Sequence, residues 1–364
     1  MLSRYLALVL GTASLAAIAG LTSPPSIRRV ATLHTARSVH TATALSSGQV
    51  LLAGGMATGE GSLASVELFD PGSNTLRDLP PLHEARDGHT ATRLPDGRVL
   101  IAGGYNGDYL ASVEVFDPVE QRFRSGGTLL EGRSGHTATL LPSGQVLFIG
   151  GVGRGWTFLA SAELYDPASG RSVAVGPLSV PRESHTATLL ADGRVLVVGG
   201  HNGRRQAMQV YASAELFDPE TRRFTPTGPL TTPRHKHDAL RLADGRVLVI
   251  GGADRTDRVH FATTELYDPR AGSFSPGPAM AAARYKIAGT SVLLSNGDVL
   301  IAAGAPNAEL LPHGMTTFEP VSGRFPASYQ FATATLLPGD NVVIVGGYDD
   351  RIESTAGVWR FGPR

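Results

Sequence analysis

The sequence predicts an all-β fold: a seven-bladed β-propeller with four antiparallel strands in each blade. One phrase recurs along the chain and is clearest from Arg182, where it reads R-E-S-H-T-A-T-L-L-A-D-G-R-V-L-V-V-G-G. Its Gly-Gly end recurs at Gly54-Gly55, Gly103-Gly104, Gly150-Gly151, Gly199-Gly200, Gly251-Gly252 and Gly346-Gly347, with Ala303-Gly304 as a degraded copy. Seven copies at a spacing of about 50 residues indicate blades repeated around a ring.

Each copy contains the signals of four strands. In His185–Leu190, small and apolar residues fit a short strand at the crowded centre of the ring. Ala191–Gly193 is a tight turn, and the apolar run that follows it suits a strand buried on both faces. A third strand ends in Asp-Pro, because proline cannot extend a ladder, and a fourth, broken by Pro and Gly, suits an outer edge.

The third-strand phrase gives the blade register. It occurs at Val66–Pro71, Val113–Pro118, Ala162–Pro167, Ala214–Pro219 and Thr264–Pro269, and in decayed form at Thr316–Pro320 and Gly357–Phe361.

The fourth strand of the seventh blade is expected from the other end of the chain. Few residues follow Val358–Phe361, whereas Arg28–Arg37 aligns with the fourth-strand phrase Arg171–Arg182. We therefore expect Ile27–Leu33 to close the ring by completing the last blade.

Composition excludes some classes of function. The chain has 32 basic and 32 acidic side chains, so no basic field attracts nucleic acid. It has no cysteine, which removes disulfides and thiolate metal sites. We expect no cofactor, no bound metal and a monomer.

The first residues resemble a secretory signal peptide. Arg4 precedes an apolar run from Tyr5 to Leu21, with small residues at Ala17-Ile18-Ala19 before Gly20. We expect residues 1–19 to be a signal peptide, 20–26 a short leader and 27–364 the propeller. The exported protein would then lie in the periplasm, at the cell surface or outside the cell, with no membrane span in the mature chain. The alternative is an uncleaved membrane anchor, since the run is near the lower limit for a span.

The repeated phrases resemble those of the kelch repeat family, and H-T-A-T-L-L-x-x-G-R-V-L-V-x-G-G also resembles the propeller of galactose oxidase. The likeness covers Ile27 to Arg364, as in bacterial kelch repeat-containing proteins. It implies the fold far more than the function, because such propellers include sugar oxidases, sialate mutarotases and protein-binding adaptors. The copper radical site of galactose oxidase needs a Tyr-Cys cross-link, which a chain without cysteine cannot form.

One face of the ring is predicted to bind a ligand. In an antiparallel blade, the loop before strand one and the loop after strand two lie at the same end. We call the loop before strand one the arginine loop and the loop after strand two the Gly-Gly loop. The arginine loops carry Arg37, Arg86, Arg133, Arg182, Arg234 and Arg284. The Gly-Gly loops vary in length and chemistry, whereas the turns on the opposite face are uniform. The predicted contacts are Arg86, Arg133, Arg182, Arg234, Tyr105, Tyr109, Trp156, His201, Asn202, Tyr211, His260 and Tyr348.

The residues repeated in every blade have a structural alternative. Arginines at this position contact acidic peptides in kelch adaptors, but side chains repeated with the blade usually pair with neighbouring groups. A structural role is the alternative for two other repeated residues as well. Histidines begin the first strand in five blades, at His40, His89, His136, His185 and His237, and Gly289 and Ala332 replace them in the other two. The carboxylates recur once per blade, at Glu67, Glu114, Glu163, Glu215 and Glu265. Blade five departs most, with Arg234–Asp238 beside His260, and is the candidate place for any metal or catalytic group.

Three functions fit these patterns. The first is an exported binding module for a glycan or a protein. The second is a carbohydrate-active enzyme, such as a mutarotase or an oxidase without the Cys-Tyr site. The third is a surface scaffold with no small ligand. No nucleophile elbow, H-E-x-x-H motif or phosphate loop favours the enzyme.

Overall fold

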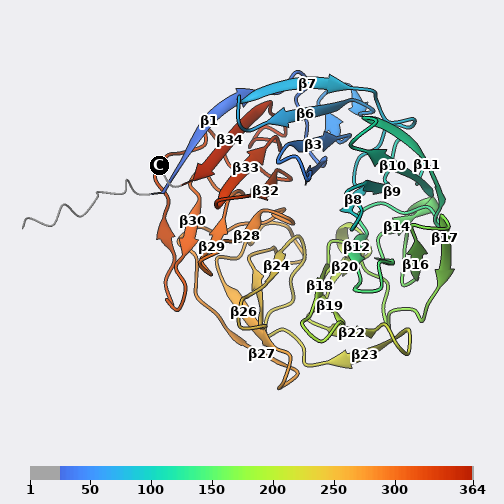
Figure 1. Ribbon diagram of the computed structural model, residues 1–364. Coiled ribbons are helices and arrows are strands. Elements are labelled where there is room, and N and C mark those ends of the chain that lie inside the picture. The colour runs from blue at the N-terminus through green and yellow to red at the C-terminus, as the bar shows by residue number, and fades with distance from the viewer. Residues whose placement is uncertain (1–24, 363–364) are drawn as a thin grey trace, which may run out of the picture.

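Seven four-stranded antiparallel sheets stand around a central channel in the computed structural model, which describes residues 25–362 (Figure 1). The short first strands lie nearest the channel and the fourth strands lie at the rim. The predicted all-β, seven-bladed propeller is confirmed. The expected signal peptide at residues 1–19 lies outside the described residues, as does most of the leader at 20–26.

The blades follow the chain in order. Blade one contains β2 (Thr41–Ala44), β3 (Val50–Ala53), β6 (Val66–Asp70) and β7 (Thr75–Leu79). Blade two contains β8 (Thr90–Arg93), β9 (Val99–Ala102), β10 (Ser112–Asp117) and β11 (Arg122–Thr128). Blade three contains β12 (Thr137–Leu140), β13 (Val146–Ile149), β16 (Ala162–Asp166) and β17 (Arg171–Ala174). Blade four contains β18 (Thr186–Leu189), β19 (Val195–Val198), β22 (Ala214–Asp218) and β23 (Arg223–Thr227).

The last three blades complete the ring. Blade five contains β24 (Asp238–Arg241), β25 (Val247–Ile250), β26 (Thr264–Asp268) and β27 (Ser273–Pro276). Blade six contains β28 (Ser291–Leu293), β29 (Val299–Ile301), β30 (Glu309–Leu311) and β31 (Glu319–Pro320). Blade seven contains β32 (Thr333–Leu337), β33 (Asn341–Val345), β34 (Gly357–Gly362) and β1 (Ser26–Thr32).

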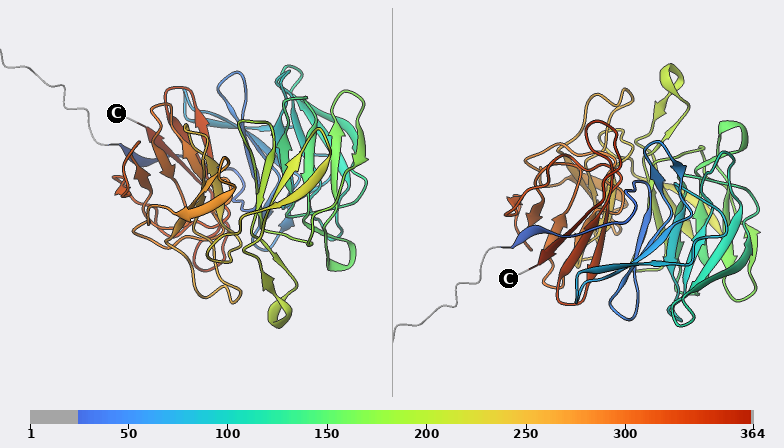
Figure 2. Two further views of the ribbon diagram at one scale, coloured as in Figure 1. Left: turned by 90° about the horizontal axis from the view of Figure 1, so that it is seen from below. Right: turned by 90° about the horizontal axis from the view of Figure 1, so that it is seen from above.

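Three Gly-Gly loops form small hairpins. They pair β4 (Met56–Ala57) with β5 (Gly61–Ser62), β14 (Val152–Gly153) with β15 (Thr157–Phe158), and β20 (His201–Asn202) with β21 (Gln209–Val210). The only helical segments among residues 25–362 are two 3₁₀ turns, Arg154–Trp156 and Arg205–Ala207. In this described part of the chain, no helix has the length and apolar character needed to cross a membrane. The hairpin β20–β21 projects from one side of the ring (Figure 2).

The hydrophobic core is divided among the contacts between blades. Every residue of β13 and β19 is buried, as their continuous apolar runs predict. One core cluster joins Leu147 and Ile149 of blade three to Val195, Val197 and Phe217 of blade four. Because each sheet packs on both neighbours, a chain of this length needs no single large core.

The N-terminal strand closes the ring, as predicted. Strand β1 pairs with β34 in antiparallel register, with Ile27 opposite Phe361 and Arg29 opposite Trp359. Figure 1 shows the two strands side by side, although they lie at opposite ends of the chain. Ile27 and Leu33 are both 4% exposed, so this segment joins the core as well as the ladder.

The predicted third strand of blade six is wrong. Thr316–Pro320 ends in β31, the outermost strand, and the third strand is β30, within the segment predicted to be a Gly-Gly loop. The register is set by Glu309, whose carboxylate lies 2.8 Å from the buried guanidinium of Arg284. The Gly-Gly loop of this blade is therefore short, and no Asp-Pro pair marks the end of β30.

The first glycine of each Gly-Gly pair is required by crowding as well as by its backbone angle. Gly199 has φ +62°, and a Cβ there would lie 2.5 Å from the carbonyl oxygen of Arg234 and 2.8 Å from Cε1 of His237. Gly193, in the turn of the same blade, has φ +86° but nothing within 4 Å of an added Cβ.

We expect Gly199→Ala to lower the free energy of unfolding by more than Gly193→Ala does. The control incurs only the left-handed backbone cost of about 1–2 kcal/mol, whereas Gly199→Ala must also displace the backbone of the next blade. Chemical denaturation of the two variants measures the difference. Equal losses would show that backbone angle alone explains the glycine.

Candidate functional site

The arginine loops and Gly-Gly loops share one face of the ring, as predicted. The residue after the repeated arginine forms a β-bridge with a residue just after Gly-Gly, for example Ser134 with Val152 and Glu183 with His201. Equivalent bridges join Ser38 to Met56, Asp87 to Tyr105, His235 to Ala253 and Gln330 to Tyr348. We call this side of the molecule the variable face.

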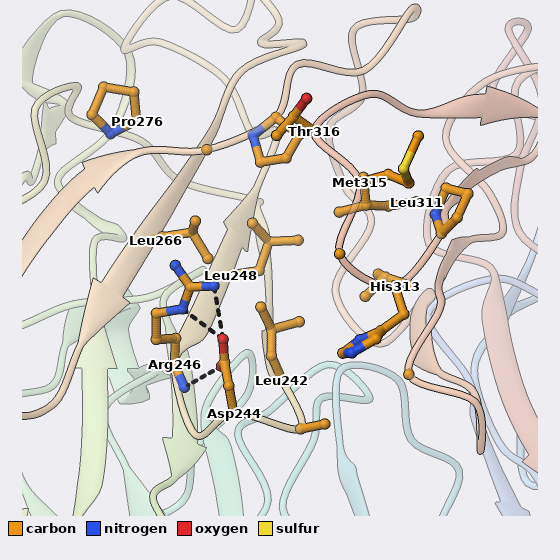
Figure 3. Close-up of a pocket in the computed structure, with 17 residues that line it drawn as sticks. Leu242, Asp244, Arg246, Leu248, Leu266, Pro276, Leu311, His313, Met315 and Thr316 are labelled. Carbon is orange, nitrogen blue, oxygen red and sulfur yellow. Dashed lines mark hydrogen bonds and ion pairs between the residues drawn. The ribbon is translucent and has the colours of Figure 1, made fainter.

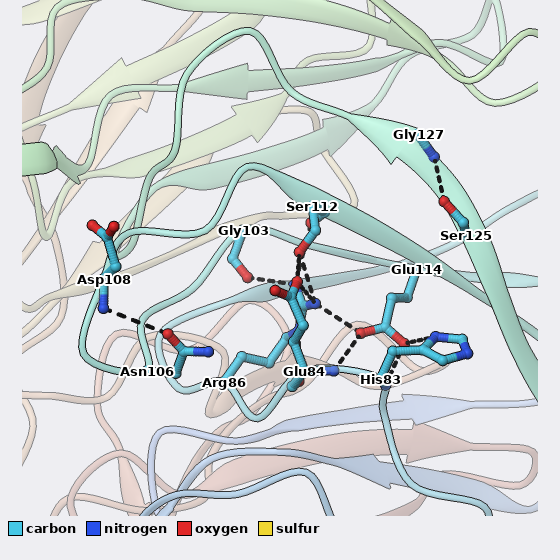
Figure 4. A network of polar contacts seen from close by, with 10 residues as sticks. All are labelled: His83, Glu84, Arg86, Gly103, Asn106, Asp108, Ser112, Glu114, Ser125 and Gly127. Atoms are coloured by element: carbon cyan, nitrogen blue, oxygen red, sulfur yellow. Dashed lines mark hydrogen bonds and ion pairs between the residues drawn. The ribbon is translucent and has the colours of Figure 1, made fainter.

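The repeated arginines lie beneath this face. In blade two, Arg86 donates to the carbonyl oxygen of Gly103 at 2.8 Å and to Glu114 at 2.7 Å, and the backbone N–H of His83 donates to the same carboxylate (Figure 4). Burial lowers the pKa of the Arg86 guanidinium, which the carboxylate opposes. The same carbonyl and glutamate contacts recur at Arg37, Arg133, Arg182, Arg234 and Arg284, all at most 1% exposed.

This geometry supports the structural alternative for the arginines. Each guanidinium bridges the Gly-Gly carbonyl of its blade and a glutamate of the third strand. Each glutamate also accepts a backbone N–H from the segment just before the arginine. The predicted contacts Arg86, Arg133, Arg182 and Arg234 thus have no free donor face on the surface. We leave them out of the candidate site.

Blade seven replaces the ion pair by aromatic packing. Trp359 lies opposite Ile344 in the register where Glu67 lies opposite Leu52 in blade one. Tyr329 stands three residues before Ala332, in the place of the arginine, and its ring lies 6.5 Å from that of Trp359. Phe325 packs on both rings, so this blade fills the position without charge.

The histidines link neighbouring blades around the channel. Nε2 of His89 lies 3.0 Å from Oγ1 of Thr41 in the preceding blade, and the same His–Thr contact occurs for His40, His136, His185 and His237. Burial lowers the pKa of His89 to about 3, so its ring is neutral. These contacts support the local structural role that the sequence suggested.

Blade six corrects one detail of that pattern. Ile287, not Gly289, occupies the histidine position, because its side chain approaches Gly251 where other blades place a histidine ring. Blade six has a two-residue insertion, Ala288-Gly289, directly after Ile287. Asp238 replaces the threonine in blade five and accepts three backbone N–H groups of blade six, from Gly289, Thr290 and Ser291.

The most variable positions lie between the repeated arginine and histidine. These two residues read Ser-Val, Asp-Gly, Ser-Gly, Glu-Ser, His-Lys, Tyr-Lys and Gln-Phe from blade one to blade seven. Of them, Asp87, Glu183, His235, Lys236, Tyr285, Lys286 and Gln330 were not among the predicted contacts. Their signal was present in the sequence: two variable residues lie between an arginine and a histidine that recur in most blades.

The second of these residues forms a ring at the mouth of the channel. In all seven blades its φ is positive, between +51° and +63°. Six of these residues donate their backbone N–H to the equivalent carbonyl oxygen of the preceding blade, at 2.8–3.3 Å. The backbone ring holds the variable side chains at fixed positions around the opening.

A pocket of about 520 Å³ lies beside the mouth, over blades two to four. Its lining includes four predicted residues, Tyr105, Tyr109, Trp156 and His201. The three aromatic rings lie 5.1–6.1 Å apart, and burial raises the pKa of Tyr109 to about 12. Arg204, from the β20–β21 hairpin, lies over the ring of Trp156 at 3.1 Å. We call this the aromatic pocket.

The other predicted residues lie elsewhere. His260 stacks on Tyr285 at 3.6 Å near the mouth, and Lys286 donates a hydrogen bond to the hydroxyl of Tyr348. Burial and the nearby Lys236 lower the pKa of Lys286 to about 8. Tyr211 packs against buried Arg182, and Asn202 lies in β20 outside the pocket lining.

Sequence comparison agrees with this architecture. A family model described as the kelch motif matches residues 89–130 and 184–231, which correspond to blades two and four. These two matches, together with the seven-bladed ring, fit a kelch-repeat propeller family. No match is found among curated proteins.

The opposite face of the propeller holds a second cavity that no sequence pattern predicted. Its volume is about 470 Å³, and it lies between blades five and six. Leu242, Leu248, Leu266 and Met315 form its apolar walls, and the ion pair of Asp244 with Arg246 lies at one side (Figure 3). The irregular segment after β30 creates it.

One group of side chains in the described part of this propeller is close enough to share a metal ion: His34, Glu67 and Asp78. Glu67 already binds Arg37 at 2.8 Å, and His34 lies 2.8 Å from Asp78. Because these contacts satisfy the three side chains, we assign them no metal. Blade five, the sequence candidate for such a site, has His235 between His201 and Asp254.

Proposed function

We propose that this kelch propeller is a binding module and that its partner is a protein seated on the variable face. The proposal rests on the position of the residues that differ between blades, which lie on the variable face. Core, arginines, glutamates and histidines repeat, whereas the mouth residues and Gly-Gly loops change from blade to blade. Kelch propellers generally act as protein-binding modules, which favours the same conclusion.

Exposed apolar side chains on the Gly-Gly loops support a macromolecular partner. They are Met56, Trp156, Val259 and Ile352, with exposed fractions of 37%, 50%, 54% and 68%. They come from four different blades around one opening. A partner that spans the mouth would cover several of them at once, and apolar anchors within a polar surface are typical of protein interfaces.

A glycan is the second candidate, and the aromatic pocket favours it. Aromatic rings with hydroxyl groups and a nearby arginine suit stacking and hydrogen bonding to a sugar. If a sugar binds, NMR of its isomers would test the carbohydrate-active enzyme that the sequence left open.

We also propose that the protein is exported. The apolar segment before residue 20 supports this proposal. Cell fractionation with N-terminal sequencing of the mature chain tests it. A cytoplasmic protein that retains Met1 would contradict it.

We expect Trp156→Ala to weaken binding to the partner at least about tenfold, as truncation of a central aromatic anchor does. The wild-type protein is used for pull-down and for a glycan array, and the affinity of each variant is then measured for the captured ligand. Val119→Ala is the matched control, because Val119 is 90% exposed but lies in the turn between the third and fourth strands of blade two. Equal affinity of the two variants would place the ligand elsewhere.

A further inference from the structure

Six of the seven blades carry an aromatic side chain at one position of the third strand. This residue lies opposite the first valine of the second strand, as Tyr267 lies opposite Val247, and in all six blades it is at most 2% exposed. The six residues are Phe69, Phe116, Tyr165, Phe217, Tyr267 and Phe361. In blade six, Leu311 takes this position opposite Val299. Within residues 25–362, blade six alone therefore lacks the ring.

In the other blades, this ring packs on apolar side chains of the preceding blade. Tyr267, from blade five, shares a core cluster with Leu190, Leu196 and Leu216 of blade four. Leucines at the same three positions accompany the aromatic rings of blades two, four and seven. Because the ring fills the space between the two sheets, Leu190 and Leu216 are only 1% and 7% exposed.

Blade five has the same three leucines but receives no ring. They are Leu242, Leu248 and Leu266, with Leu248 opposite Leu266 as Leu196 is opposite Leu216. Leu248 is fully buried in the second strand, whereas Leu242 and Leu266 are only half-buried. All three line the cavity between blades five and six. The cavity therefore lies where an aromatic side chain from blade six would pack.

The size of this cavity suits a small molecule. Figure 3 shows the leucines of blade five on one side and Leu311 with Met315 on the other, and the volume is about 470 Å³. An apolar cavity of about 150 Å³ already binds benzene, and small-molecule pockets measure roughly 300–1,000 Å³. The space therefore holds one ring together with its substituents. We call it the interblade cavity.

Two other blades show what a hydroxyl group on such a ring would contact. Tyr165 donates a hydrogen bond to the carbonyl oxygen of Gly126, on the fourth strand of blade two. The hydroxyls of Tyr267 and Thr227 lie 2.8 Å apart, and Thr227 is on the fourth strand of blade four. In both cases the ring spans the space between two blades and its hydroxyl reaches the outer strand of the preceding sheet.

The outer strand of blade five contributes Pro276, Gly277 and Pro278 to the lining of the interblade cavity. Gly277 takes the place of Thr227, and its N–H donates to the carbonyl oxygen of Thr264 at 3.0 Å. The two prolines have no N–H. This stretch therefore offers carbonyl oxygens but no N–H to a ligand, which favours a hydroxyl group that donates.

We propose that the interblade cavity is a small-molecule site for a single aromatic ring that carries a hydroxyl group. The ring packs on the three leucines of blade five, in place of the side chain that blade six lacks, and the hydroxyl donates to the carbonyl oxygens of Pro276–Pro278. The site lies on the face opposite the variable face. The inference is thus independent of the protein partner proposed above.

The first test uses p-cresol as the probe and methionine methyl groups as reporters of where it binds. The chain has five methionines, of which Met315 lines the interblade cavity and Met208 lines the aromatic pocket. Spectra of Met315→Leu and Met208→Leu assign the two ¹³C-methyl signals. We expect p-cresol to shift the Met315 signal, because the bound ring lies beside this methyl group, and to leave the Met208 signal unchanged. No shift at Met315, or a shift at Met208 alone, would overturn the site.

Two analogues test the chemistry of the ligand. 4-Methylcyclohexanol has the heavy atoms of p-cresol but no aromatic ring, and 4-methylanisole keeps the ring but cannot donate a hydrogen bond. Titration of the Met315 signal gives the affinity of each compound. We expect both to bind more weakly than p-cresol. Equal affinity of 4-methylcyclohexanol would contradict the preference for an aromatic ring, and equal affinity of 4-methylanisole would contradict the hydroxyl contact.

Variants that fill the cavity should remove the site. Leu311→Phe restores the aromatic residue of the other blades and Leu266→Phe adds a ring from the opposite wall, so each should weaken p-cresol binding at least about tenfold. Leu130→Phe is the matched control, because Leu130 is 60% exposed and lies outside the cavity lining.

Thermal melts of the same proteins give a second readout. Saturating p-cresol should raise the melting temperature of the wild type and of Leu130→Phe, because a ligand that binds only the folded state stabilises it, but not that of the filled variants. Either filled variant is sufficient for the test if the other does not fold. Unchanged affinity for p-cresol in a folded Leu311→Phe or Leu266→Phe protein would overturn the proposal.

Discussion

Deletion of Ser26–Leu33 is expected to lower the melting temperature by roughly 10 °C or more. The deletion removes β1 and two buried side chains, Ile27 and Leu33. It also exposes the edge of β34, so the variant should associate at high concentration. Differential scanning calorimetry and size-exclusion chromatography measure the two effects.

A variant on the same strand provides the control for ring closure. Arg29 is exposed, so Arg29→Ala should melt close to the wild type, whereas Ile27→Ala should lose about 2–5 kcal/mol. If the deletion left the melting temperature unchanged, the pairing of β1 with β34 would not be what holds the ring shut.

The second large effect is expected at the buried ion pairs. Arg182→Met should cost about 3–5 kcal/mol of unfolding free energy, because it leaves the carboxylate of Glu215 buried without its cation. Arg182 also donates to the carbonyl oxygen of Gly199 at 2.8 Å, which would lose this partner. Urea denaturation gives the free energy.

The same blade offers a matched surface pair. Arg194 and Asp192 lie 2.7 Å apart, but their side chains are 36% and 46% exposed. Arg194→Met should therefore change the unfolding free energy by at most about 1 kcal/mol. A loss at Arg182 no larger than this would show that the repeated arginines are not structural, and would return them to the candidate binding surface.

Strong periodicity explains which features were predictable. Strand order, ring closure by β1 and the shared face of the two loop types follow from the repeat, because a residue that recurs in every blade has the same neighbours in every blade. The prediction failed where the repeat decays. In blade six, the Glu309–Leu311 strand lacks Asp-Pro, and the insertion after Ile287 hid the histidine position.

The site was predictable only in part for a related reason. Aromatic residues in the Gly-Gly loops indicated Tyr105, Tyr109 and Trp156, which the structure brings into one pocket. Contacts in and behind its wall join residues from different blades, such as His201 with His235. No spacing along the chain specifies a hydrogen bond between neighbouring blades.

The sequence by itself determined the seven blades, the all-β class, the closure and the face on which the blades differ, because each follows from a pattern local to one repeat. Only the tertiary structure decided that the arginines lie beneath the surface paired with glutamates, and that Glu183 and His201 line one wall of the pocket with His235 buried behind them. The physical reason is that burial and charge pairing depend on how adjacent sheets pack, which a repeat specifies only where every copy is the same.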